Sequence, residues 1–325
     1  MVLLSVSNLK KYFPLQKSFI EQIISRRKQY VKAVDGISFI IREGEVFSLV
    51  GESGCGKTTT GRLIVRLETP DSGKIVFDGK DITFAKEKEL RPLRRKMQII
   101  FQDPYASLNP RMTIGNAIAE PLIIHGIADK KEAKEEALEM LKSVGLTPPE
   151  LFYKAYPHQL SGGQRQRVVI ARAMILKPKF IVADEPVSMI DVSLRASILK
   201  LLMKFKKDFN LTMLFITHDL AVARLISDIV AVMYLGKIVE IAPVNELVEN
   251  PLHPYTKALL SSVPTIMPQM KREKIILKGD VPNPINPPPG CKLHPRCPLA
   301  FERCSREEPK LKYVGNNHYV ACHLL

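Results

Sequence analysis

The sequence predicts an α/β fold in which a mainly parallel sheet is covered by helices on both faces. Short apolar runs at 46–50, 97–101, 179–184, 211–217 and 229–234 have the length of buried strands, and stretches with helical character separate them. Strands that alternate with helices favour parallel pairing. A mainly helical stretch from about 111 to 178 interrupts this order, so we expect a helical subdomain inserted into the α/β core.

A glycine-rich loop follows the first of these strands. Residues 51–58 read GESGCGKT, and a helix is expected to continue through about Leu67, which is the order that a phosphate-binding loop requires. Backbone N–H groups then cradle the phosphates, Lys57 reaches the β- and γ-phosphates, and the Thr58 hydroxyl ligates Mg²⁺. The residues expected to contact the nucleotide are Gly51, Glu52, Ser53, Gly54, Cys55, Gly56, Lys57, Thr58 and Thr59, with Cys55 as a small buried filler.

A pair of acidic residues ends the apolar strand at 179–184. Asp184 is expected to orient the Mg²⁺ shell, and Glu185 can accept a proton from the attacking water. Acidic residues also cap helices, and Pro186 follows directly. Because a phosphate loop lies upstream, we favour the catalytic roles.

Composition indicates a protein without a membrane span. Of 325 residues, 46% are hydrophobic and 25% are charged, and no apolar run approaches the roughly 20 residues that cross a bilayer. The N-terminal residues lack the apolar stretch of a signal peptide. The net charge of +15 is dispersed, which favours a solvated surface near an anionic membrane over a nucleic-acid site.

Residues 264–325, called the tail below, have a different composition. Five prolines between 282 and 289 predict an irregular linker, and Cys291, Cys297, Cys304 and Cys322 follow it. The tail has too few apolar residues for a core, so we expect it to need a cofactor or a covering surface. Four thiols favour a tetrahedral zinc or an iron–sulfur cluster over disulfides.

The signature LSGGQ at residues 160–164 lies between the phosphate loop and the acidic strand. This order resembles the ATP-binding cassette (ABC) ATPases. The resemblance implies a RecA-like P-loop core at 1–263, with a helical subdomain inserted at about 103–178. It also implies that ATP is sandwiched at a dimer interface, between the phosphate loop of one subunit and the signature of the other. The signature contacts would be Ser161, Gly162, Gly163 and Gln164.

Further positions match the family's motifs. Gln102 occupies the place of the glutamine that contacts Mg²⁺ and water, and His218 resembles the switch histidine at the γ-phosphate. Asp191 ends SMID, where the family usually has SALD, so Met189 and Ile190 depart from the pattern. An aromatic residue usually stacks on adenine in this family, and Phe13 fits that position best, with Tyr12 as the alternative.

Several longer stretches of the sequence resemble the corresponding stretches in the ATP-binding subunits of dipeptide and oligopeptide importers. The stretches are 31–39, 51–59, 99–114, 156–174, 248–264, 290–300 and 318–325. The resemblance implies import of a di- or oligopeptide, with two transmembrane permease subunits, a second, non-identical ATP-binding subunit and an extracytoplasmic binding protein. The chain would lie on the cytoplasmic face of the membrane. Alternatives are import of oligosaccharides or nickel, and a soluble ABC ATPase acting on nucleic acid.

Tails of this kind in the importer family are associated with a 4Fe–4S cluster, which we expect here in preference to zinc. His294, His318 and His323 are the spare ligands if the site holds zinc. The basic segment at 15–32 has no counterpart in a minimal cassette, and the sequence assigns it no role.

Overall fold

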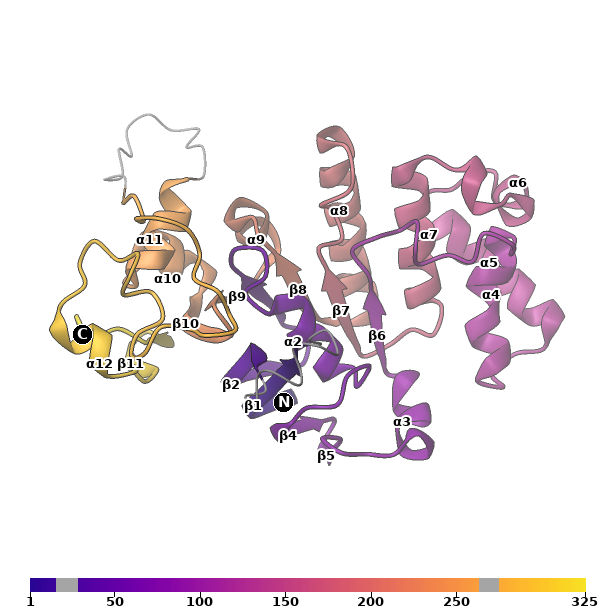
Figure 1. Cartoon of the computed structure of the whole chain (residues 1–325). Coiled ribbons are helices and arrows are strands. Elements are labelled where there is room, and N and C mark those ends of the chain that lie inside the picture. The colour runs from indigo at the N-terminus through magenta and orange to yellow at the C-terminus, as the bar shows by residue number, and fades with distance from the viewer. Residues whose placement is uncertain (16–28, 263–274) are drawn as a thin grey trace, which may run out of the picture. The chain divides into compact units, whose positions relative to one another are not determined.

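A computed structural model of the chain describes residues 1–15, 29–262 and 275–325 (Figure 1). The chain divides into two compact units. Unit 1 consists of residues 1–42, 46–84 and 217–325, and unit 2 consists of residues 43–45 and 85–216. Residues 16–28 of the basic segment and the predicted boundary at 263/264 lie outside the described residues, so that boundary stays a prediction.

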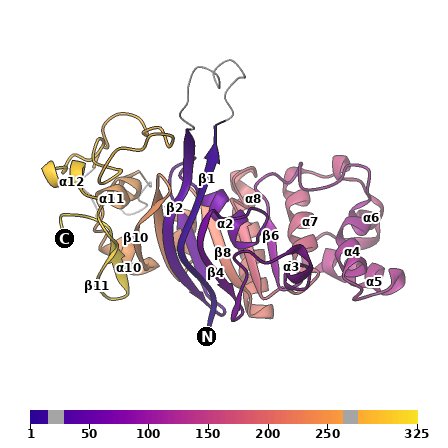
Figure 2. The ribbon, with the colours of Figure 1, turned by 60° about the horizontal axis from the view of Figure 1, so that its bottom comes forward.

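Unit 1 contains an antiparallel sheet that the apolar runs of the sequence do not predict. Its order is β2 (Tyr30–Arg42), β1 (Val2–Pro14), β4 (Ser72–Phe77) and β5 (Lys80–Asp81), as Figure 2 shows for the first three. Register shifts interrupt the pairing of β1 with β2, for example between Val6 and Leu9. Such bulges break the alternation of apolar and polar residues, which hides these strands in the sequence.

The second set of strands in unit 1 carries the phosphate loop. Its order is β11 (Lys312–Gly315), β12 (His318–Val320), β10 (Lys237–Pro243), β9 (Ile229–Tyr234) and β3 (Val46–Val50). Strands β3 and β9 are parallel, and the other pairs are antiparallel. Helix α2 (Lys57–Ile64) follows the loop and ends before the predicted Leu67. Among the described residues of unit 1, the other helices are α9 (Leu220–Ile226), α10 (Val244–Glu249), α11 (Pro254–Ser261) and α12 (Glu302–Arg306).

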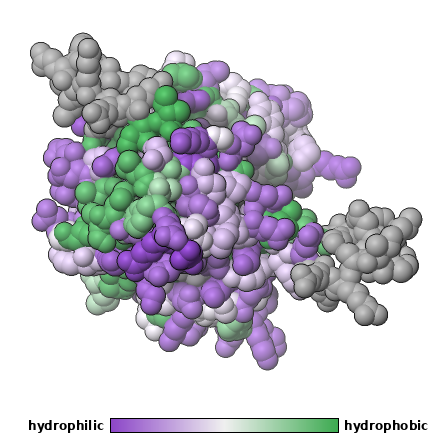
Figure 3. Space-filling model, turned by 60° about the vertical axis from the view of Figure 1, so that its left-hand side comes forward, coloured by the Kyte–Doolittle hydropathy of each residue, from purple (hydrophilic) through white to green (hydrophobic). Residues whose placement is uncertain are grey.

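The described part of the tail, residues 275–325, belongs to unit 1 and packs against its other segments instead of forming a core of its own. Leu293 is buried in a cluster with Tyr234, Leu247 and Tyr255, and Cys291 and Cys297 pack against that cluster. Strand β12 extends the sheet at β10. The tail is expected to need either a cofactor or a covering surface in order to fold. A covering surface is present. Apolar side chains also gather on the face of unit 1 that Figure 3 brings forward.

Unit 2 is the helical insertion together with three parallel strands. The strand order is β8 (Thr212–Thr217), β7 (Phe180–Asp184) and β6 (Met97–Ile100). Helical structure occupies much of 111–178, as predicted. The helices are α3 (Glu87–Arg94), α4 (Ile114–Ile124), α5 (Lys130–Ser143), α6 (Pro149–Lys154), the 3₁₀ turn η1 (Pro157–Gln159), α7 (Gly162–Met174) and α8 (Val192–Phe209).

Helix α5 shows how the sequence sets these elements. Asp129 accepts hydrogen bonds from the N–H groups of Lys131 and Glu132, which caps the first turn. Ala133, Ala137 and Leu141 are buried on the predicted face. Gly145, with φ +76°, follows the last turn. Within the described ranges, no helix is both long enough and apolar enough to cross a membrane.

Candidate nucleotide-binding site

The phosphate loop turns tightly between β3 and α2, and the chain around it admits only glycine at two positions. A Cβ atom at Gly51 would lie 2.1 Å from the carbonyl oxygen of Met233. At Gly56, where φ is +105°, a Cβ atom would lie 2.0 Å from the carbonyl oxygen of Ala33. Real Cβ atoms do not approach backbone this closely. These two glycines are thus required by packing against β9 and β2, in addition to any role at a phosphate.

Lys57 directs its ammonium group into the loop. The side chain is buried, and Nζ donates to the carbonyl oxygens of Gly51 at 2.8 Å and Glu52 at 2.9 Å. Ser53 and Gly54 form the exposed tip, while Thr58 and Thr59 are half-buried in the first turn of α2. A buried cation at a helix N-terminus is suited to an anionic ligand.

Cys55 is buried in the same loop, and burial raises the pKa of its thiol. The thiol is therefore held in its neutral form, which is a poor nucleophile. This agrees with the expectation that Cys55 fills space and does no chemistry.

In unit 2, the structure brings Gln102 and Glu185 together. Ile100 of β6 pairs with Ala183 of β7 in parallel, so the residues after both strands emerge at one edge of the sheet. Gln102 Nε2 donates to Glu185 Oε2 at 3.2 Å. Asp184 is buried at the end of β7.

Glu185 has a left-handed backbone, with φ +44°. A non-glycine residue with this conformation is uncommon, and such strain concentrates at functional sites. The helix-cap alternative finds no support in α8, because that helix begins seven residues later, at Val192.

The signature forms the start of α7. Ser161 is the N-cap residue and its Oγ accepts from the N–H of Gln164 at 3.4 Å, while the Gln164 side chain accepts from the N–H of Ser161 at 3.0 Å. This is a capping box. A Cβ atom at Gly163 would lie 2.7 Å from Cδ1 of Leu194. The serine and glutamine thus have a structural role that the sequence analysis does not foresee, and Ser161 remains exposed.

The remaining predicted residues divide between the units. His218 is exposed after β8 in unit 1, and the neighbouring Asp219 caps α9 by accepting from Ala221 N–H at 2.8 Å. Asp191 is the exposed N-cap residue of α8 in unit 2 and makes no side-chain cap hydrogen bond. The phosphate loop and His218 therefore belong to unit 1, and the acidic pair, Gln102 and the signature belong to unit 2.

The two candidates for the adenine-stacking aromatic differ in their polar contacts. The Tyr12 hydroxyl donates to Asp35, and burial and that carboxylate raise the pKa of Tyr12. Phe13 is half-buried on the same strand, with Lys11 Nζ at 5.2 Å from its ring centroid. Because Tyr12 is fixed by its hydroxyl, Phe13 is the more available ring.

The four tail cysteines influence one another's pKa values. Burial, followed by the charges of the other three thiols, raises the pKa of Cys291 to about 11. All four are free thiols. Among the described residues, no three histidine, cysteine or acidic side chains are arranged to hold a metal ion.

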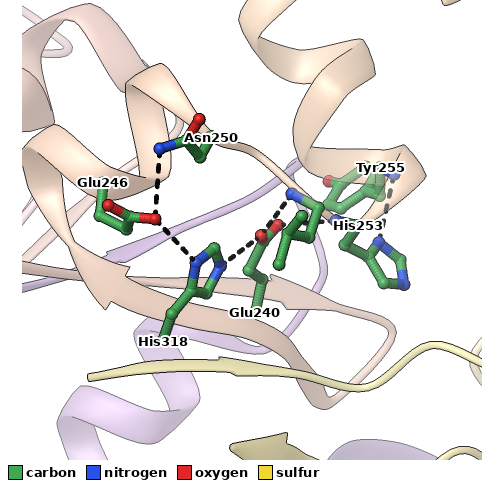
Figure 4. Close-up of polar contacts among 7 residues, drawn as sticks. Glu240, Glu246, Asn250, His253, Tyr255 and His318 are labelled. Carbon is green, nitrogen blue, oxygen red and sulfur yellow. Dashed lines mark hydrogen bonds and ion pairs between the residues drawn. The ribbon is translucent and has the colours of Figure 1, made fainter. Parts of the chain in front are cut away.

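The spare histidines have other partners. His318 is buried, and its Nε2 lies 2.7 Å from Glu240 Oε1 (Figure 4). Glu240 also accepts from the N–H groups of Leu252 and His253. His318 thus joins the tail to β10 through its Nε2, and its expected use as a spare zinc ligand stays a prediction. The role of Glu240 could not be predicted from the sequence, because its partner His318 lies 78 residues away.

Comparisons with known proteins agree with this geometry. A model of the ABC transporter family matches residues 34–188, and a model of the oligopeptide/dipeptide transporter C-terminal region matches residues 239–304. The oligopeptide transport ATP-binding protein AppF of Bacillus subtilis (strain 168) is 50% identical over 325 residues, covering 99% of this chain and 97% of that protein. The chain belongs to the ABC transporter family. The dipeptide transport ATP-binding protein DppF of Haemophilus influenzae is 46% identical over 321 residues, covering 98% of this chain and 96% of that one.

Solved structures of ABC cassettes have the same fold. A dimeric, post-hydrolysis structure of the ATP-binding cassette MJ0796 bound to ADP and Pi superposes with a TM-score of 0.64 at 31% identity. The match covers 74% of this chain and 99% of that chain. The predicted ABC ATPase fold is confirmed. This protein is an ABC ATPase, and ATP with Mg²⁺ is the typical ligand of that family.

Proposed function

We propose that this ABC ATPase powers the import of di- or oligopeptides. The observation that carries the proposal is the full-length similarity to proteins named for oligopeptide and dipeptide transport, at 50% and 46% identity. The match of residues 239–304 to the C-terminal region of such transporters supports the same substrate class. No residue of this chain is assigned to the peptide itself.

In this proposal the phosphate loop binds ATP, and the residues that match the family's other motifs divide the chemistry. Lys57 would stabilise the β- and γ-phosphates, Thr58 and Gln102 would ligate Mg²⁺, and Asp184 would orient its shell. Glu185 is the general base, held by Gln102 at 3.2 Å, and His218 contacts the γ-phosphate. The signature of a second subunit closes each site, and Asp191 lies at the subunit seam.

Substitution of Glu185 by glutamine tests the catalytic assignment. The variant should bind ATP normally and hydrolyse it about 10²–10⁴-fold more slowly, because a general base contributes about that factor. Glu139→Gln, an exposed change on α5, is the matched control and should keep full turnover. Normal turnover in the Glu185 variant would remove this residue from the catalytic set.

The expected partners are two permease subunits, a second, non-identical ATP-binding subunit and an extracytoplasmic binding protein, with the chain peripheral on the cytoplasmic face. Purification from detergent extracts tests this assembly. Permeases and a peptide-loaded binding protein should accompany the chain. Recovery with nucleic acid instead of permeases would favour the nucleic-acid alternative, and an oligosaccharide or nickel on the binding protein would change the substrate class.

For the tail we propose a 4Fe–4S cluster held by Cys291, Cys297, Cys304 and Cys322, with zinc as the alternative. Support comes from the presence of four free thiols in one segment and from the chemistry of cysteine ligands. Thiolate ligation would supply a cross-link to a segment with little core. Anaerobic purification followed by iron, sulfide and zinc analysis distinguishes the two. Stoichiometric zinc without iron would contradict the cluster.

A further inference from the structure

Glu52, in the phosphate loop, is contacted by residues from far along the chain. Arg296 of the tail donates from Nη1 to Glu52 Oε2 at 2.9 Å and from Nη2 to Oε1 at 3.4 Å. The N–H of Glu52 donates to the Tyr255 hydroxyl at 2.9 Å. Residues 203 and 244 positions away thus hold one residue of the loop.

All of the polar groups of Glu52 are engaged within its own chain. Its carbonyl oxygen accepts from Lys57 Nζ at 2.9 Å and from Cys55 N–H at 3.3 Å. With its N–H on Tyr255 and its carboxylate on Arg296, Glu52 has no donor to offer a phosphate. It serves as the anchor at the start of the loop.

The guanidinium group of Arg296 is itself held in place. Its side chain is 10% exposed, and Nη1 also donates to the Tyr234 hydroxyl at 3.4 Å. The Tyr234 ring lies 5.9 Å away and packs against the Tyr255 ring, with 4.8 Å between centroids. Because the guanidinium group is immobilised, its two hydrogen bonds restrain the carboxylate of Glu52. A solvent-exposed arginine would restrain it much less.

The same segment of the tail is fixed at a second point. Lys292 is buried and donates from Nζ to Asp35 on β2 at 2.9 Å and to the carbonyl oxygen of Leu235 at 2.9 Å. Asp35 also accepts from the Tyr12 hydroxyl. The segment that carries Arg296 is therefore attached to the sheet and not only to the loop.

The ion pair also has an electrostatic consequence for an anionic ligand. Glu52 places a negative charge in a loop whose ligand is a polyphosphate, and charges in a partly buried site interact more strongly than in water. We propose that Arg296 is a positioning residue of the nucleotide site, which fixes the phosphate loop through Glu52 and neutralises its carboxylate. Order in the tail is thereby coupled to ATP affinity. This inference rests on the proposed role of the phosphate loop in binding ATP.

Substitution of Arg296 by methionine in the full-length protein tests the inference. Methionine keeps a long apolar side chain against Tyr234 but loses the charge. We expect the Kd for a fluorescent ATP analogue with Mg²⁺ to rise about tenfold, which corresponds to about 1.4 kcal/mol. In the assembled transporter KM for ATP should rise by a similar factor, with kcat nearly unchanged. Arg303→Met is the matched control, because Arg303 pairs with Glu307 on the exposed side of the same tail.

The double variant Glu52→Gln/Arg296→Met separates this role from simple stabilisation of the tail. If the unpaired carboxylate weakens binding, removing it should restore most of the affinity. A Kd of Arg296→Met equal to that of Arg303→Met, or a double variant no better than Arg296→Met, would overturn the inference. Lys57→Ala tests the underlying assignment separately: undiminished binding there would overturn the proposed role of the loop as well.

Discussion

The buried imidazole of His253 makes the stability of unit 1 depend on pH. His253 is 1% exposed at the start of α11, and its Nδ1 accepts from Tyr255 N–H at 3.2 Å. Burial lowers the pKa of His253 from 6.5 to about 4, against the opposing charge of Glu240. Figure 4 shows these groups together. In the folded protein the imidazole therefore stays neutral at pH values where the unfolded chain binds a proton.

The sign and the size follow from this difference. The contribution of neutral His253 to the free energy of unfolding is fully present above pH 6.5. It is lost as the pH falls toward 4, because the unfolded state binds more protons than the folded state in that window. At about 1.4 kcal/mol per pKa unit, the loss by pH 5 is about 2 kcal/mol. For a chain of this length that lowers Tm by about 3 °C.

The assay compares thermal unfolding of the wild type and His253→Asn at pH 7.5 and pH 5. Asparagine can accept the same N–H hydrogen bond but does not titrate. The fall in Tm should be about 3 °C smaller in the variant, since carboxylate titration affects both proteins equally. His158→Gln, at an exposed position, should behave as the wild type. Equal pH dependence in the wild type and the His253 variant would refute the reasoning.

Four further substitutions test other contacts. His318→Ala leaves the buried Glu240 carboxylate without its imidazole partner, so chemical denaturation should show a loss of about 1–3 kcal/mol in the free energy of unfolding; a loss below about 0.5 kcal/mol would contradict a structural pair. Gly51→Ala should abolish ATP binding or folding, because the new Cβ would meet the Met233 carbonyl at 2.1 Å; normal nucleotide titration would show that the strand yields. Phe13→Ala should weaken ATP binding by about 1–3 kcal/mol while Tyr12→Phe should not, and the reverse order in the same titration would assign the stacking ring to Tyr12.

The nucleotide motifs were predictable because each is local. A strand, a glycine-rich turn and a helix lie within about twenty residues, and their spacing fixes where the loop N–H groups point. The four strands that follow, and the helical insertion, were predictable from apolar runs and helical periodicity. The proximity of Gln102 and Glu185 also follows from parallel strand order, because both residues lie just beyond paired strands.

Other features have no local signal. The antiparallel sheet of unit 1 is hidden by bulges between β1 and β2. The capping role of Ser161 was readable from the Ser-x-x-Gln spacing, but the stronger resemblance of LSGGQ to a nucleotide contact concealed it. The partners of His318 and Arg296 come from residues 78 and 244 positions away, and such pairs depend on how the tail packs.

The sequence by itself determined that this chain is an ABC ATPase, since the family's motifs, among them the phosphate loop at 51–58 and LSGGQ at 160–164, are short and local. Only the tertiary structure decided that the cysteine-bearing tail packs on the same unit as the phosphate loop and that Arg296 pairs with Glu52 there. The physical reason is that an ion pair between distant segments forms only when packing brings those segments together, and no periodicity in the sequence indicates such a contact.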